Sequence, residues 1–149
     1  MKPKGTIVAL RRKYPRLVHQ VEHSLRLKFR KKPTLRVSKG GRPRDECLRE
    51  HDGHGTVTKV VLARVTIPKR MAKEDPKLAE LAVLHELREN LLFQRGRSQS
   101  QAHRKASKME RGDRKRLGLK KSAGWLFRDH YGWKREEGPF QKLVRNIRF

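Results

Sequence analysis

Five consecutive residues, His85-Glu86-Leu87-Arg88-Glu89, combine side chains that can ligate a metal ion with one that can act as a base. Residues four apart on a helix share a face, so His85 and Glu89 point the same way if this segment is helical. An imidazole and a carboxylate can both ligate zinc, and Glu86 can serve as general base for water, as in the H-E-x-x-H arrangement. The spacing therefore predicts a metal site with Glu86 as its catalytic residue.

A further protein ligand must come from another part of the chain, and the following segment offers two candidates. His103 and Glu110 are seven residues apart, which places them on nearly the same face of a helix. We therefore expect a zinc site with His85, Glu89, His103 and Glu110 as candidate ligands. A salt-bridged helix surface is the alternative, because Glu is common on helices and the charge of Arg88 opposes cation binding.

These side chains require two helices joined by a short turn, and the sequence contains start signals for both. Asp75-Pro76 supplies a cap residue followed by proline at the first helical position, predicting a helix to about residue 93. Ser98 and Gln101 form a capping box that predicts a second helix over residues 99–117. The metal-site residues should thus face one another across a helical hairpin.

The segment before these helices mixes helical and strand signals. Apolar residues at helical spacing predict a first helix with Pro15 in its first turn, and β-branched runs predict two strands. The short apolar run Thr6–Leu10 fits a strand or the approach to a helix. The predicted order is a helix over 14–29, a strand over 34–38, a loop over 39–54 and a strand over 56–68.

This order, together with Ala102-His103-Arg104-Lys105-Ala106, resembles the minimal zincin scaffold of small metallopeptidase-like proteins, in which a His-Glu-x-x-Glu helix precedes an Ala-His-x-x-Ala helix. The likeness covers roughly residues 14–118. It implies an α+β fold: a zincin-like core at 1–118 with a helix, a short sheet and a two-helix active-site unit, followed by a basic and aromatic extension at 119–149. Its specific residues are His85, Glu86, Glu89, Ala102, His103 and Glu110.

The resemblance also implies roles for these residues. His85, Glu89 and His103 correspond to metal ligands, Glu86 to the base, and Glu110 to a ligand or to a partner that orients a histidine. The strand over 56–68 would be the edge strand along which a zincin aligns an extended peptide. The sequence departs from H-E-x-x-H in carrying Glu89 where that motif has its second histidine, which bears on the identity of the metal.

The net charge of the chain indicates a binding function beside the metal site. Its 149 residues include 40 Lys and Arg against 15 Asp and Glu, a net charge of +25. Residues 1–50 hold 16 basic and 4 acidic side chains, residues 51–100 hold 9 and 6, and residues 101–149 hold 15 and 5. Such an excess predicts a polyanionic partner, and we expect nucleic acid rather than an anionic membrane, which favours amphipathic helices with aromatic anchors.

Basic clusters can neutralise phosphates, and aromatic rings among basic residues can stack on bases. RNA is favoured over DNA because no helix-turn-helix, zinc-finger or basic-zipper signature is present. The tail aromatics also fit a role in capping the core. The candidate nucleic-acid-binding residues are Arg11, Arg12, Lys13, Arg30, Lys31, Lys32, Arg42, Arg44, Arg114, Lys115, Arg116, Lys120, Lys121, Trp125 and Trp133.

The apolar content and the single cysteine indicate where the protein is located. No apolar run approaches the roughly 18 residues of a membrane span, no signal peptide is visible, and Cys47 is the only cysteine, so we expect a cytoplasmic protein. Cys47, His51 and His54 are metal-ligand types without a common zinc-finger spacing, and a loop fits them equally.

The sequence favours an RNA-binding protein, associated with a ribonucleoprotein such as the ribosome, on a zincin-like scaffold. The alternative is a zinc-dependent metallopeptidase or hydrolase localised on nucleic acid or a nucleoprotein particle.

Overall fold

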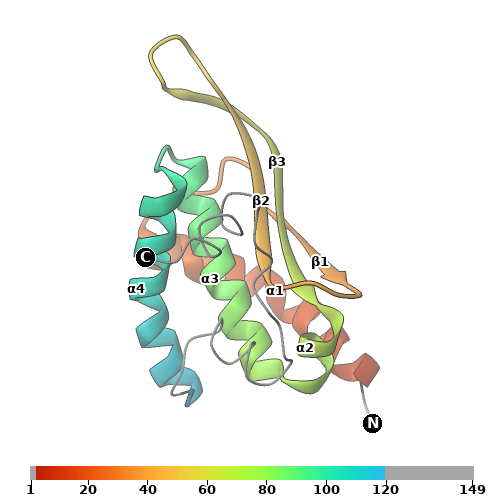
Figure 1. Ribbon diagram of the computed structural model, residues 1–149. Coiled ribbons are helices and arrows are strands. Elements are labelled where there is room, and N and C mark those ends of the chain that lie inside the picture. The colour runs from red at the N-terminus through yellow and green to blue at the C-terminus, as the bar shows by residue number, and fades with distance from the viewer. Residues whose placement is uncertain (1–2, 120–149) are drawn as a thin grey trace, which may run out of the picture.

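Residues 3–119 are described by a computed structural model in which helices cover a three-stranded sheet (Figure 1). The fold is mixed α+β, as the sequence predicts. No helix among these residues is long and apolar enough to cross a membrane. The elements are α1 (Pro3–Leu25), β1 (Thr34–Ser38), β2 (Arg44–His51), β3 (Val57–Pro68), α2 (Lys69–Glu74), α3 (Pro76–Gln94) and α4 (Gln99–Leu117).

The sheet has the strand order β1-β3-β2, with β1 parallel and β2 antiparallel to β3. The expectation that residues 56–68 form an edge strand is therefore wrong, because β3 is central and β1 and β2 flank it. β2 and β3 form a long hairpin that extends beyond the helices (Figure 1). At its turn, the side chain of Asp52 accepts hydrogen bonds from the backbone N–H groups of His54 and Thr56 at 2.8 and 2.9 Å.

β2 lies where the sequence predicts only a loop over residues 39–54, and that prediction is wrong for residues 44–51. Its residues are mostly charged and have low β propensity, so no local pattern identifies a strand. Pairing with β3 supplies the backbone partners, and a cross-strand bond of 2.6 Å joins Arg64 to Glu46. The strand therefore depends on contacts with a neighbour that the local sequence does not reveal.

The first helix begins and ends earlier than predicted. It spans residues 3–25 rather than 14–29, so Thr6–Leu10 is helical and Pro15 lies inside the helix instead of in its first turn. Leu10 before Pro15 and Leu17 after it are both buried in the same core, which explains why the helix continues through the proline. The helix ends where Arg26 adopts a left-handed φ of 54°.

α3 occupies the centre of the fold and contacts both the sheet and the other long helices. Leucines 78, 81, 84, 87 and 91 are fully buried, and buried residues lie on all sides of the helix. The predictions of the helices over 75–93 and 99–117 are confirmed to within a residue or two: Asp75 accepts from the backbone N–H of Leu78, and Ser98 and Gln101 form the capping box. The short helix α2, which joins β3 to α3, has no counterpart in the prediction.

Candidate functional site

Two neighbouring helices position the predicted metal ligands. α3 carries His85 and Glu89 one turn apart, and α4 carries His103 near its start. Because only residues 95–98 separate the helices, the end of α3 and the beginning of α4 lie close together, as Figure 1 shows. The local sequence therefore brings a histidine of α4 to the face of α3 that bears His85 and Glu89.

A single carboxylate oxygen lies between the two histidines. Glu89 Oε2 is 3.3 Å from His85 Nε2 and 3.3 Å from His103 Nδ1. The two imidazole rings meet edge to face, with centroids 5.2 Å apart. One ligand atom from each of the three residues lies within 4.8 Å of the others. The structure thus brings together three of the four predicted ligands.

Two of the three distances between these ligand atoms have the length found around a tetrahedral zinc ion. Ligand atoms about 2.0–2.1 Å from zinc and separated by tetrahedral angles lie about 3.3 Å from one another. The two distances from Glu89 Oε2 have this value. Two imidazoles and one carboxylate also form a donor set that zinc accepts, leaving a fourth position for water or substrate.

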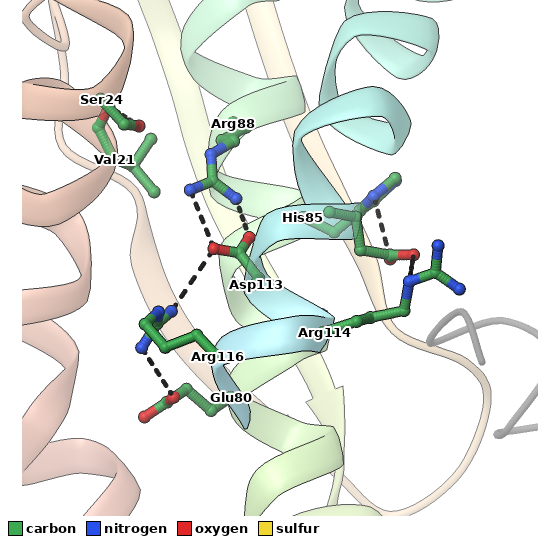
Figure 2. A network of polar contacts seen from close by, with 9 residues as sticks. Val21, Ser24, Glu80, His85, Arg88, Asp113, Arg114 and Arg116 are labelled. Atoms are coloured by element: carbon green, nitrogen blue, oxygen red, sulfur yellow. Dashed lines mark hydrogen bonds and ion pairs between the residues drawn. The ribbon is translucent and has the colours of Figure 1, made fainter. Parts of the chain in front are cut away.

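Glu110 lies on the opposite side of the His85 ring from Glu89. Its Oε1 atom is 3.4 Å from His85 Nδ1, whereas Glu89 approaches Nε2. Arg114 lies one turn further along α4, with its Nε atom 4.0 Å from Glu110 Oε2, and both His85 and Arg114 appear in Figure 2. Of the two roles that the sequence left open for Glu110, this position fits orienting His85 rather than binding the metal.

Arg88 does not direct its charge into this cluster, contrary to the sequence-based expectation. Its buried guanidinium forms an ion pair with Asp113 of α4, with a second contact of 3.3 Å between Nη2 and Oδ1 (Figure 2). Arg116 approaches the same carboxylate at 3.4 Å and also lies 3.8 Å from Glu80. The positive charge of Arg88 is therefore compensated within the protein.

A further carboxylate, Asp45 of β2, lies beside the cluster and was missed by the sequence analysis. Carboxylate oxygens of Asp45, Glu86 and Glu89 lie within 4.8 Å of one another. The buried amide of Asn90 holds β2 at this position, because its Nδ2 atom donates to Asp45 Oδ2 at 3.2 Å and to the backbone carbonyl of Glu46 at 3.1 Å. No local signal could identify Asp45, since its segment was predicted to be a loop.

The crowding of carboxylates around His85 changes the pKa values of the cluster. Burial lowers the pKa of His85, but hydrogen bonds with Glu110 and Glu89 and the charges of Glu86 and Glu110 outweigh it and raise that pKa to about 10. Burial raises the pKa of Glu86 well above its ordinary value, although the positive charge on His85 opposes the change. Burial and the charge of Glu89 raise the pKa of Asp45 to about 6. Without a cation, the cluster therefore retains protons that compensate its negative charge.

A small pocket opens beside the cluster, between β2 and the helical hairpin. Its volume is about 40 Å³, more than the roughly 10–15 Å³ that one water molecule needs. Burial raises the pKa of the Cys47 thiol to about 11, so this residue is a protonated thiol at neutral pH. The pocket is lined by Asp45, Cys47, Glu89, Phe93, Gln99 and Ala102.

Within residues 3–119, only two groups of side chains have metal-ligand spacing: His85 with Glu89 and His103, and Asp45 with Glu86 and Glu89. Cys47, His51 and His54 are therefore not brought together as a ligand set. Cys47 faces the pocket from β2, His51 ends that strand, and His54 lies in the hairpin turn.

The predicted nucleic-acid contacts lie on several elements. Arg11, Arg12 and Lys13 are exposed on α1, residues 30–32 follow that helix, Arg42 precedes β2, Arg44 begins it, and residues 114–116 lie in the last turn of α4. Some have internal partners: Lys13 and Arg116 pair with Glu80, and Lys31 Nζ donates to the carbonyl of Val61 at 2.9 Å. Lys120, Lys121, Trp125 and Trp133 lie outside the described residues.

Comparisons of the chain with models of known protein families, with curated proteins and with solved structures gave no match.

Proposed function

We propose that this protein is a zinc-dependent hydrolase of the metallopeptidase type. The observation that carries the proposal is the position of Glu89 Oε2, 3.3 Å from a nitrogen of both His85 and His103. The three side chains come from two helices and meet beside a pocket large enough for water. A salt-bridged helix surface can form within α3 alone, whereas here α4 brings a second imidazole to the same carboxylate oxygen.

Each residue of the cluster has a separate part in this proposal. His85, Glu89 and His103 would hold the metal, and Glu110 would orient the His85 ring through Nδ1. A bound zinc ion supplies Lewis-acid chemistry, polarising a carbonyl group and lowering the pKa of water. Glu86 would accept the proton of the attacking water once a bound cation favours its ionised form, and burial then makes this carboxylate more basic than an exposed one.

An extended peptide is the substrate class that best suits the surroundings of the cluster. β2 is an outer strand of the sheet, and its residues Asp45 and Cys47 line the pocket. An outer strand has one edge without a strand partner, to which an extended chain can add by main-chain hydrogen bonds. β2 thus takes the role that the sequence analysis assigned to the strand over 56–68.

The test is a comparison of turnover and metal content in matched variants. Glu86→Gln should retain zinc and lose hydrolysis of a fluorogenic peptide library, because it removes the proton acceptor and keeps the ligands. His85→Ala should lose both zinc and hydrolysis, whereas His51→Ala in the exposed hairpin should lose neither. Full activity of Glu86→Gln would refute the proposed role of Glu86, and an inactive zinc-loaded native protein would refute the function.

RNA binding is a second candidate function, favoured by the direction of the charged side chains on α4. The acidic side chains of α4, Glu110 and Asp113, are buried against His85 and Arg88, while most of its seven Lys and Arg residues are exposed. Together with the net charge of +25, this supports attachment to a ribonucleoprotein particle. RNA binding should weaken by orders of magnitude between 50 and 300 mM salt, and a flat salt response would refute it.

A further inference from the structure

The exposed face of α4 carries a continuous row of cationic side chains. Arg104, Lys108, Arg111 and Lys115 follow at intervals of four, three and four residues. At 100° and 1.5 Å per residue, they lie within about 60° of arc and span about 16 Å along the helix axis. All four are exposed, and we call them the α4 basic row.

Within the described part of the chain, no acidic residue forms an ion pair with the α4 basic row. The two carboxylates of α4 point inward, where Glu110 approaches His85 and Asp113 binds Arg88. Like charges four residues apart destabilise a helix, and a glutamate within the row would relieve this repulsion. The arrangement therefore suits a ligand that itself brings the negative charges.

We propose that the α4 basic row binds the phosphodiester backbone of a nucleic acid. The proposal rests on the second candidate function and assigns it a surface. A nucleic-acid backbone presents regularly spaced negative charges, which match a linear row of cations. A membrane-binding helix would present apolar side chains or large aromatic rings beside its cations, and the exposed residues between Gln99 and Arg116 include no apolar side chain and no ring other than the His103 imidazole.

The α4 basic row lies directly beside the candidate metal site. His103 directly precedes Arg104, and its exposed ring lies against Glu89 at that site. A nucleic-acid strand along the row would therefore pass next to the cluster without occupying the pocket, which is lined from β2, the end of α3 and the first turns of α4. Binding at the row would hold the hydrolytic site close to proteins associated with that nucleic acid.

The test compares two quadruple variants with the same loss of charge. Arg104→Gln, Lys108→Gln, Arg111→Gln and Lys115→Gln remove the row while keeping residues that favour helices. The control replaces Arg16, Lys28, Arg36 and Lys77 by Gln, which removes two Arg and two Lys from exposed positions outside the predicted nucleic-acid contacts. Binding of labelled 20-nucleotide single-stranded RNA and DNA is measured by fluorescence anisotropy between 50 and 400 mM KCl.

We expect the row variant to bind RNA at least tenfold more weakly than the control variant at 100 mM KCl. The slope of log K against log salt should fall by about three, since each lost contact with a single strand removes about 0.7. If DNA binding weakens to a similar extent, the row contacts the phosphodiester backbone of either nucleic acid, as proposed. If the row variant retains DNA binding, that assignment is wrong. Unchanged thermal unfolding and zinc content would show that the variant is folded.

Other outcomes overturn the proposal and separate it from the second candidate function. If both quadruple variants lose RNA affinity equally, RNA binding stands as a function but the row is not its surface. A native protein that binds no RNA at 50 mM KCl would refute both. Tighter binding to vesicles containing anionic lipid than to RNA would replace nucleic acid by a membrane as the partner.

Discussion

Glu110→Gln should weaken zinc binding without removing a metal ligand. Glu110 is buried, with 5% of its surface exposed, and its Oε1 atom lies 3.4 Å from His85 Nδ1, the nitrogen directed away from Glu89. The substitution keeps the size of the side chain and removes the negative charge that orients and polarises the imidazole. Loss of such a partner typically lowers metal affinity by about 10–100-fold, which corresponds to about 1.4–2.8 kcal/mol.

The assay is zinc affinity measured by competition with a chromophoric chelator at pH 7.5. Glu74→Gln is the matched control, because Glu74 is an exposed carboxylate of α2 that pairs with Arg70, away from the cluster. We expect Glu74→Gln to bind zinc with the native affinity. We expect Glu110→Gln to bind one equivalent of zinc more weakly. Affinity within twofold of the native value in Glu110→Gln would refute the inference that Glu110 acts through His85. Complete loss of binding in a folded variant would instead identify Glu110 as a ligand.

Two further predictions concern stability. Asp113→Asn leaves the buried guanidinium of Arg88 uncompensated and should lower the free energy of unfolding by about 3–5 kcal/mol in urea titrations; a loss below 1 kcal/mol would contradict the buried ion pair. In the metal-free protein, His85 has a raised pKa of about 10, so its protonated form stabilises the folded state. This stabilisation is complete below the unfolded-state pKa of about 6.5 and is lost as pH rises towards 10. Unfolding at pH 6, 8 and 9.5 should therefore show decreasing stability that His85→Gln makes less steep, and equal pH dependence in both proteins would contradict the assignment.

The helices of the site could be predicted from the sequence because their boundaries are determined locally. Asp75 and Ser98 each bond to a backbone N–H group within three residues, so the start of each helix is visible without knowledge of the fold. The four residues between the helices require neighbouring helix ends. The approach of His103 to His85 and Glu89 follows from these local features.

The rest of the site depends on contacts between distant segments. Asp45 reaches the cluster only because β2 pairs with β3 and Asn90 of α3 binds the strand, and neither contact has a local sequence signal. The position of Glu110 relative to the His85 ring and the pairing of Arg88 with Asp113 depend on how α3 and α4 pack. Residue types and spacing therefore identify candidates, whereas the direction of each side chain depends on how the elements pack.

The central claim is that His85, Glu89 and His103 together bind one metal ion. Its most direct test is the zinc content per chain after removal of nucleic acid in high salt, measured for the native protein, His85→Ala, His103→Ala and the control His51→Ala. We expect one equivalent in the native protein and the control and less than about a tenth of an equivalent in the other two, because each loses one of three ligands. Undiminished zinc in His85→Ala or His103→Ala, or no zinc in the native protein after dialysis against zinc, would contradict the claim.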